Sequence, residues 1–415
     1  MGRVVLLFFV LAVSMSTTAR AGNEAVSRPA ATRPAGGPER AAERLALPTG
    51  AYYWLKLPHG YGYGEEPPLV VCLHGTDEPA AEAIKFWSSC GLHKGAVWVA
   101  PQSSGPGWRD TDLRRLADIW IDVQRRVTFD RGRVLLVGFS AGGAMAFHWV
   151  YREGFPATAV ATLANYLPPS ITTAEVAARK NVPVFYAVGM SDINHERMRR
   201  GLAMLRGEGV HVTLCRPPIG HVLSAEVGRE AIAWFEERAR ERVSGEIRQA
   251  AAGLDRGRIS DAAVLADRIM RQRRWHDACN VVAAEKLWAE ASRTGREQLA
   301  GADALAAAGR NVDAILSLRS VENMYAGTSL ADHARQRREA IEADPAVRNE
   351  VAARERAERE RRAMELYLDA QRRLAAGGLD DARRYCQTVV TTYGDTRAAE
   401  YAAAMLRKLP ENDIP

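Results

Sequence analysis

The chain has 415 residues, of which 47% are hydrophobic and 26% charged, and its formal net charge is +6 at pH 7. This composition is that of an ordinary globular protein and excludes a disordered or fibrous chain. The length exceeds that of one typical domain, so we expect two domains with flanking tails.

The first 21 residues have the pattern of a secretory signal peptide. Arg3 precedes the apolar run 4–13, and Ala19-Arg20-Ala21 ends the segment with an A-x-A cleavage pattern. An apolar run of this length is too short to span a bilayer as a helix. We therefore predict cleavage before Gly22 and export to the periplasm or the medium, with an uncleaved membrane anchor as the alternative. No later segment is long and apolar enough to span a membrane, so no transmembrane segment is expected after cleavage.

The charge and the cysteines restrict the partners. Residues 1–21 carry two arginines and no acid, so their removal lowers the net charge from +6 to +4. That is modest for the size of the chain and argues against a nucleic-acid partner. The five cysteines form no C-x-x-C pair and no Cys/His metal spacing, so no metal site is expected. Buried free thiols are the preferred interpretation, and one disulfide is the alternative.

Residues 22–48 are rich in Ala, Pro, Gly and Arg, which predicts a flexible linker. From residue 49 to residue 242, short apolar runs alternate with amphipathic segments. The expected strands are 52–57, 69–73, 96–100, 134–137, 160–163, 184–188 and 210–214. The expected helices are 113–127, 142–151, 198–205 and 224–240. This alternation predicts an α/β domain with a mostly parallel sheet covered by helices on both faces.

The strongest chemical signal is Gly138-Phe139-Ser140-Ala141-Gly142, which matches G-x-S-x-G between an expected strand and an expected helix. In that context the serine occupies a strained turn that projects its hydroxyl above the sheet. Glycines on both sides avoid clashes across the turn. The motif therefore predicts Ser140 as a catalytic nucleophile.

A second motif, Leu73-His74-Gly75-Thr76, follows the strand 69–73. We expect the backbone N–H of Thr76 to join that of Ala141 in an oxyanion hole. His74 precedes the serine in the chain, so we interpret it as structural rather than as the catalytic base.

The other catalytic partners follow from chain order, which in this arrangement is serine, then acid, then histidine. His221 lies between the last expected strand and the closing helix, where an imidazole can reach Ser140. Asp192 follows an expected strand directly, and a carboxylate there can orient His221. A helix cap is the alternative role for Asp192. We expect His148 to point away from the hydroxyl and His195 to lie on a helix face.

These motifs give residues 49–242 a resemblance to the α/β-hydrolase superfamily. The segments that carry it, besides those above, are Ala100-Pro101-Gln102, Gly107-Trp108, Phe129 to Val134, and Gly220-His221. The resemblance is greatest to small secreted esterases, the group of polyhydroxyalkanoate depolymerases, feruloyl esterases and phospholipase/carboxylesterase-type enzymes.

The resemblance implies Ser140 as nucleophile, His221 as base, Asp192 as acid, oxyanion amides near Thr76 and Ala141, and no cofactor. It implies hydrolysis of carboxylic esters through an acyl-enzyme. The alternatives are a peptidase of the same fold and a non-catalytic binding protein that acts through its helices. No long lid insertion is visible, so we expect an open site for small or exposed esters. Trp108 and Tyr166 are candidates for its pocket, with core packing as their alternative role.

The remainder, 243–409, is rich in Ala, Arg and Glu and is expected to form an all-α, helical-repeat-like domain, with 410–415 as a tail. The pattern Gly-x-x-x-Asp-Ala recurs at 257–262, 309–314 and 377–382, and a degenerate copy ends at Asp277-Ala278. The spacing is 36 residues from Asp277 to Asp313 and 68, twice 34, from there to Asp381, near the tetratricopeptide period. A scaffold for a protein partner and a module that only stabilises or spaces the enzyme are both compatible with this pattern.

Overall fold

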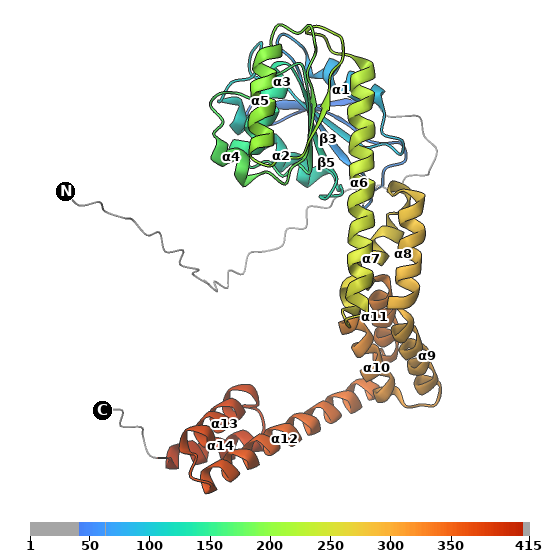
Figure 1. Ribbon diagram of the computed structural model, residues 1–415. Helices are drawn as coiled ribbons and strands as arrows, with labels where there is room; N and C mark the ends of the chain where they lie inside the picture. The colour runs from blue at the N-terminus through green and yellow to red at the C-terminus, as the bar shows by residue number, and fades with distance from the viewer. Residues whose placement is uncertain (1–40, 63, 410–415) are drawn as a thin grey trace, which may run out of the picture.

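The chain folds into a sheet-containing unit followed by a long array of helices (Figure 1). This computed structural model describes residues 41–62 and 64–409. The predicted signal peptide, linker residues 22–40 and the tail 410–415 lie outside the described residues. Within them, no helix has the combination of length and apolar character that crossing a membrane requires.

An eight-stranded sheet forms the centre of the first unit, with strand order β1-β2-β4-β3-β5-β6-β7-β8. The edge strand β1 pairs antiparallel with β2, β2 pairs antiparallel with β4, and β3 to β8 are parallel to one another. The strands are β1 (Glu43–Ala46), β2 (Tyr52–Lys56), β3 (Leu69–Leu73), β4 (Val97–Pro101), β5 (Val134–Phe139), β6 (Ala159–Leu163), β7 (Val184–Ala187) and β8 (Val212–Cys215). The predicted fold class, a mostly parallel sheet followed by an all-helical region, is confirmed.

Helices cover both faces of the sheet. Successive residues of the strands point to opposite sides, and since these residues are apolar, both faces must be buried. Val71 and Leu73 of β3 join one apolar cluster, and Val70 and Cys72 join the other. On the second face lie α1 (Ala80–Cys90) and the first half of α6 (Ala225–Leu254). The first face is covered by α2 (Asp112–Arg126), α3 (Ala141–Phe147), a π-helical turn (His148–Arg152), α4 (Thr173–Ala178) and α5 (His195–Gly207).

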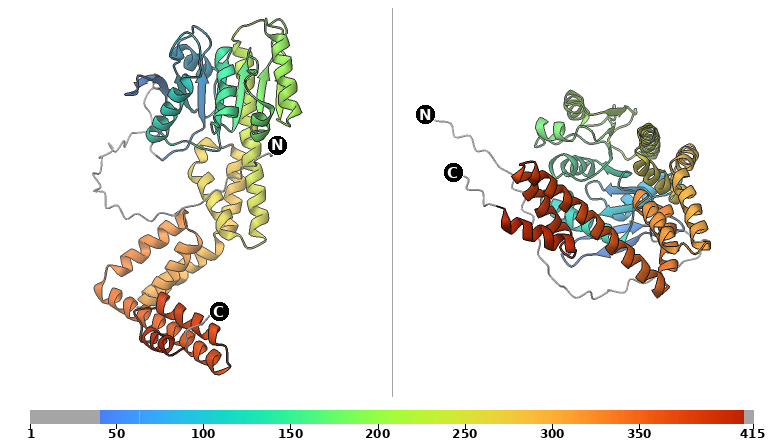
Figure 2. Two further views of the ribbon diagram at one scale, coloured as in Figure 1. Left: turned by 90° about the vertical axis from the view of Figure 1, so that its left-hand side faces the viewer. Right: turned by 90° about the horizontal axis from the view of Figure 1, so that it is seen from below.

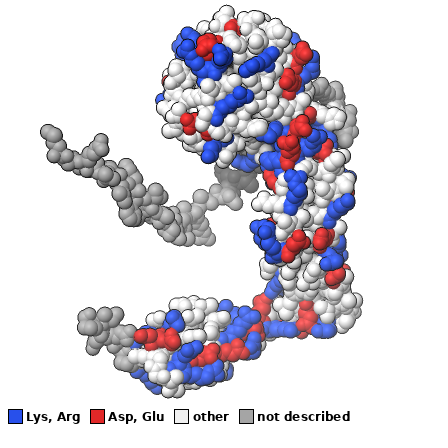
Figure 3. Space-filling model, viewed as in Figure 1, with Lys and Arg blue, Asp and Glu red and all other residues white. Residues whose placement is uncertain are grey.

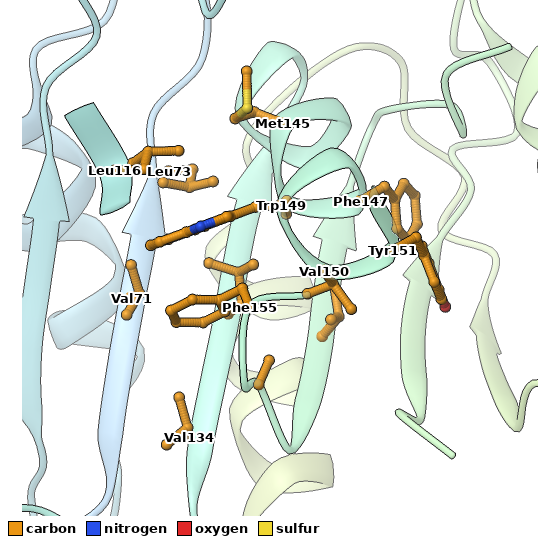
Figure 4. Packing of buried hydrophobic residues seen from close by; sticks show 14 of the residues in the cluster. Val71, Leu73, Leu116, Val134, Met145, Phe147, Trp149, Val150, Tyr151 and Phe155 are labelled. Atoms are coloured by element: carbon orange, nitrogen blue, oxygen red, sulfur yellow. The ribbon is translucent and has the colours of Figure 1, made fainter. Parts of the chain in front are cut away.

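The predicted helix 142–151 is two pieces, because α3 passes into the π-helical turn at His148. The wider turn places the three consecutive side chains of Trp149, Val150 and Tyr151 in the core. Trp149 stacks on Phe155 with ring centroids 3.8 Å apart (Figure 4).

Three elements differ from the sequence prediction. The predicted linker 22–48 contains β1. Its four residues have no buried face, so the sequence shows no apolar alternation there, and pairing with β2 holds the strand in place. The helices α1 and α4 were also not predicted. The α1 helix buries Ala83, Ile84 and Trp87 against the sheet, a helical spacing that is visible in the sequence.

The helical region begins inside α6, which runs without a break through the predicted domain boundary at 242/243. Successive helices then pack against one another, and the long α12 leads to the last two (Figures 1 and 2). Their bounds are α7 (Ile259–Arg271), a 3-10 turn (Arg273–Trp275), α8 (Ala278–Ala291), α9 (Arg293–Ala307), α10 (Asn311–Met324), α11 (Ser329–Glu342), α12 (Pro345–Ala375), α13 (Leu379–Thr392) and α14 (Arg397–Lys408).

The recurring Gly-x-x-x-Asp-Ala pattern marks turns between these helices. Each of its glycines, Gly257, Gly309 and Gly377, has a φ near +80° just after a helix end, a conformation that favours glycine. The Asp of each copy lies in the first turn of the next helix, where the helix dipole favours an acid. The Ala of each copy is fully buried. The pattern therefore has a structural explanation, and tetratricopeptide character remains a prediction.

Charged side chains of both signs are interspersed along the visible face of the helical region (Figure 3). Some of them join segments that are distant in sequence: Arg354 of α12 pairs with Asp313 of α10 at 2.7 Å, and Arg359 of α12 pairs with Asp395, in the turn before α14, at 2.6 Å. These pairs are exposed, so each contributes little to stability by itself.

A buried arginine fastens the helical region to the sheet-containing unit at the edge where the parallel strands begin. Arg133 directly precedes β5, pairs with Asp130 at 2.6 Å, and donates hydrogen bonds to the carbonyls of Trp275 and Glu66. Beside it, Lys94 donates to the carbonyl oxygen of His276. The helical region is thus fixed by buried polar contacts as well as by the continuous α6.

The buried His276 at this joint should make stability depend on pH. Burial and the nearby Arg133 lower the pKa of His276 from 6.5 to about 3. The unfolded chain therefore takes up a proton at this imidazole as pH falls below about 6.5, whereas the folded protein takes it up only near pH 3. We predict that His276→Gln removes about 2 kcal/mol of the loss in unfolding free energy between pH 7 and pH 5.

Urea denaturation at the two pH values measures this difference. The exposed His333 of α11 provides the matched control, because His333→Gln should leave the pH dependence as in the wild type. An unchanged pH dependence in His276→Gln would contradict the prediction.

Candidate active site

Ser140 lies at the sharp turn between β5 and α3. Its backbone has φ 50° and ψ −117°, a region that side-chain-bearing residues rarely occupy. Its N–H donates to the carbonyl oxygen of Leu163 at the end of β6, at 3.0 Å. The turn is therefore held by the neighbouring strand, and the structure has the strand–serine–helix geometry that the motif predicts.

The glycines around Ser140 are required by backbone packing. A Cβ on Gly142 would lie 2.2 Å from the carbonyl oxygen of Leu73, and one on Gly138 would lie 2.5 Å from the backbone of Gly142. A Cβ on Gly143 would lie 2.6 Å from the side chain of Asn165. These distances are far inside van der Waals contact, so only glycine lets α3 start directly against the end of β3.

The structure brings Ser140, His221 and Asp192 together. His221 Nε2 lies 2.8 Å from Ser140 Oγ, and His221 Nδ1 lies 3.0 Å from Asp192 Oδ2. The Asp192 side chain is fully buried, whereas the His221 side chain is 28% exposed. An imidazole in this position can take the serine proton through Nε2, while the carboxylate fixes the protonated Nδ1.

Asp192 is not the cap of α5, whose N-cap residue is Asn194, but both of its carboxylate oxygens have partners. Its Oδ1 accepts a hydrogen bond from the backbone N–H of Asn194 at 2.7 Å, at the entry to α5. Its Oδ2 faces His221. The two oxygens are used separately, so the turn that leads into the helix also fixes the carboxylate that faces the imidazole.

Of the two predicted oxyanion donors, Thr76 lies in the loop after β3 and Ala141 is the first residue of α3. In the loop after β3, the Gly75 N–H donates to Glu78 Oε2 at 2.8 Å and the Asp77 N–H donates to the carbonyl oxygen of Pro106 at 2.6 Å. Within the described part of the chain, neither the Thr76 N–H nor the Ala141 N–H donates to a protein acceptor. Their role as oxyanion donors remains a prediction.

His74 is buried and braces this loop. Its Nε2 accepts from the Ser103 N–H at 3.1 Å, and its Nδ1 lies 2.7 Å from the carbonyl oxygen of Gly75, to which it donates in the neutral form. Burial lowers the pKa of His74, which favours that neutral form. Its contacts are those of a structural histidine.

The two predicted pocket residues are half-buried. The Trp108 indole donates to the His74 carbonyl oxygen at 2.8 Å, and its ring lies 4.7 Å from the His74 ring. Tyr166 packs against the apolar core, with the Arg197 guanidinium 5.2 Å from its ring centre. Trp108 thus supports the loop after β3. A substrate contact for either residue remains a prediction.

The remaining histidines near the site have other partners. His148 Nε2 lies 3.2 Å from Ser170 Oγ, and His195 Nδ1 lies 2.8 Å from the Gly189 carbonyl oxygen. Sequence reasoning missed Glu78, whose carboxylate holds the Gly75 amide. The signal for it is an acid three residues after the amide that it accepts from, the spacing of a local side-chain turn.

No protein-family model matches the chain. A bifunctional acetylxylan esterase/xylanase from Neocallimastix patriciarum is 27% identical over 151 residues, which is 34% of this chain and 22% of that protein. The match thus spans about a fifth of the length of this curated relative.

Solved structures are similar to just under half of this chain at low identity. S-formylglutathione hydrolase from Staphylococcus aureus is 11% identical and covers 47% of this chain and 95% of its own, with a TM-score of 0.40. The Bacillus cereus carboxylesterase is 15% identical, covers 46% and 94%, and has a TM-score of 0.37. A ferulic acid esterase from Anaeromyces mucronatus is 15% identical, covers 48% and 92%, and has a TM-score of 0.38.

Three features identify the fold of the sheet-containing unit. They are the mostly parallel sheet, the serine turn at the end of β5, and the chain order serine, aspartate, histidine. The sheet-containing unit is an α/β-hydrolase fold. We call residues 43–242 the hydrolase unit and residues 243–409 the helical arm. All residues of the site belong to the hydrolase unit.

The packing at Gly142 should limit stability. We predict that Gly142→Ala lowers the unfolding free energy by at least about 2 kcal/mol, because its Cβ must displace the β3 backbone. Gly301, inside α9, has open space where a Cβ would lie, with nothing within 4 Å, so Gly301→Ala is the control. It should leave stability unchanged or raise it by up to about 1 kcal/mol. Denaturant titration of the two variants tests this, and equal stabilities would contradict the packing argument.

Proposed function

We propose that this protein is a serine hydrolase that cleaves carboxylic esters. The observation that carries the proposal is the hydrogen-bonded series Asp192–His221–Ser140, with distances of 3.0 and 2.8 Å. Two backbone amides have no protein acceptor in the described chain: that of Ala141, which directly follows Ser140, and that of Thr76, in the loop after β3.

The proposed reaction has two halves. Ser140 Oγ attacks the ester carbonyl carbon while its proton passes to His221 Nε2. The carbonyl oxygen becomes an oxyanion that the Thr76 and Ala141 amides stabilise. When the tetrahedral intermediate collapses, the carbon–oxygen bond to the alcohol breaks and His221 returns the proton to the departing oxygen. Water then attacks the acyl-enzyme by the same steps and releases the acid, which restores Ser140.

The curated relative is described as an acetylxylan esterase/xylanase, and this supports esters rather than peptides as the proposed substrates. The hydrolase unit needs no cofactor for this reaction, because nucleophile, base and oxyanion donors are all protein groups. A peptidase of the same fold would use the same groups and is distinguished by its substrate.

Substitution of the triad provides the test. We predict that Ser140→Ala lowers kcat/KM for p-nitrophenyl acetate about 10⁴-fold or more, and that Asp192→Asn lowers it about 10²- to 10⁴-fold, because the imidazole loses its orienting carboxylate. The exposed Ser89 of α1 supplies the control, and Ser89→Ala should keep wild-type kinetics.

Three results would count against this proposal. Full activity in the Ser140→Ala variant would exclude Ser140 as the nucleophile. Turnover of an anilide as fast as that of the ester with the same acyl group would favour the peptidase. A folded wild-type protein without activity on any ester would favour the binding protein.

We also propose that the helical arm serves as a scaffold for a protein partner or as a spacer, rather than as a lid. Its buried joint lies at Arg133, where β5 begins, whereas Ser140 follows the end of the same strand. Strand β5 thus separates the arm from the site. The arm extends away from the hydrolase unit in Figure 1 and in the left-hand view of Figure 2.

Export is the proposed localisation, supported by the composition of residues 1–21. We predict that the protein recovered from the periplasm or medium of a Gram-negative host begins at Gly22 by N-terminal sequencing. Leu7→Arg, which interrupts the apolar run, should leave the precursor in the cell. Recovery of uncleaved protein in the membrane fraction would indicate the anchor instead.

A further inference from the structure

The loops after β7 and β8, which contain Asp192 and His221, carry exposed apolar side chains. Met190 is 53% exposed, Ile193 is 87% exposed and Val222 is 52% exposed. Among the described residues of the hydrolase unit, the one other large hydrophobic side chain with comparable exposure is Ile121 of α2, at 47%. We call Met190, Ile193 and Val222 the apolar rim. Grouped apolar exposure of this kind marks contact surfaces for apolar ligands or partners.

The rim is continuous with the triad along the chain. Met190 and Ile193 flank the segment that contains Asp192, and Val222 directly follows His221. The rim side chains therefore lie within two residues of groups that contact one another and Ser140.

Backbone hydrogen bonds hold the two loops of the rim together. The Met190 N–H donates to the Pro217 carbonyl oxygen at 3.0 Å, and the Ser191 N–H donates to the Ile219 carbonyl oxygen at 3.1 Å. Because the loops are joined in this way, the rim side chains are presented on an ordered backbone. A preorganised apolar surface binds an apolar group with a smaller entropy cost than a flexible loop would.

The proposed reaction determines which part of an ester reaches this surface. The carbonyl oxygen must face the Thr76 and Ala141 amides, and the departing alcohol oxygen must lie within hydrogen-bonding distance of His221 Nε2 to receive its proton. The alcohol part of the substrate therefore lies on the side of the site formed by the His221 loop. The acyl part extends from the carbonyl carbon in a different direction, away from the His221 loop.

We propose that the apolar rim binds the apolar substituent of the alcohol, so that the preferred substrates are esters of long-chain alkyl or aryl alcohols rather than methyl esters. This inference rests on the proposed ester hydrolysis and adds the side of the ester that the enzyme recognises. The rim residues are neighbours of Asp192 and His221 in the sequence. This favours a substrate group, rather than a second copy of the chain, as the group that binds to the rim.

Two ester series measured with the full-length mature protein test the proposal. Hexyl acetate against methyl acetate varies the alcohol, and methyl hexanoate against methyl acetate varies the acyl group. All acetates give the same acetyl-enzyme, so kcat/KM in the alcohol series reports acylation alone. We expect Ile193→Gln to lower the hexyl/methyl ratio about three- to ten-fold, as loss of a few methylene contacts does, and to leave the acyl ratio unchanged.

Matched variants separate local from general effects. Ile193→Leu should retain the wild-type alcohol ratio, since it keeps an apolar side chain of the same volume, and Val222→Thr should lower that ratio. Ile121→Gln makes the same replacement at an exposed isoleucine on α2 and should leave both ratios unchanged.

The proposal is overturned if Ile193→Gln and Val222→Thr leave the alcohol ratio at the wild-type value, or if the acyl ratio falls instead. It is also overturned if sedimentation shows a wild-type dimer that Ile193→Gln converts to monomer, because a second copy then covers the rim. These outcomes are ratios among active variants, so they are distinct from failure of the Ser140→Ala test, which would remove the proposed function itself.

Discussion

The hydrolase unit depends on one close contact between backbone segments, where the start of α3 meets the end of β3. At Gly142 there is no room for a side chain, because the carbonyl oxygens of Leu73 and His74 occupy the space that a Cβ would need. The strained Ser140 turn is possible because its neighbours lack side chains. The same contact places the first amide of α3 beside the loop that carries Thr76. A single packing constraint thus positions the proposed nucleophile and both proposed oxyanion donors.

The proposed active site and the joint to the helical arm lie at opposite ends of strand β5. Ser140 follows the carboxyl end of β5, and Arg133, which binds the arm through the Trp275 carbonyl, precedes its amino end. The α6 helix begins just after His221 and continues to Leu254, so it connects the two ends without a flexible joint. This geometry supports the proposed role of the arm as a scaffold or spacer.

The sequence was sufficient to predict the features that depend on short motifs and chain order. The G-x-S-x-G motif and the position of Asp192 after a buried strand predicted residues that the structure brings within hydrogen-bonding distance. The edge strand β1 was missed because it has no buried face of its own. The joint was not predictable, because Arg133 and Trp275 are 142 residues apart and no local pattern connects them. The exposure of Ile193 was equally hidden, since an apolar residue beside a strand is expected to be buried.

Covalent labelling of the folded protein tests the central claim, that His221 activates Ser140 as a nucleophile, most directly. Mass spectrometry after reaction with a fluorophosphonate should find one adduct, on the peptide that contains Ser140. The adduct should be absent when the protein is first unfolded in urea, because the unfolded serine has no imidazole beside it. No adduct on the folded wild-type protein, or an adduct on another residue, would contradict the claim.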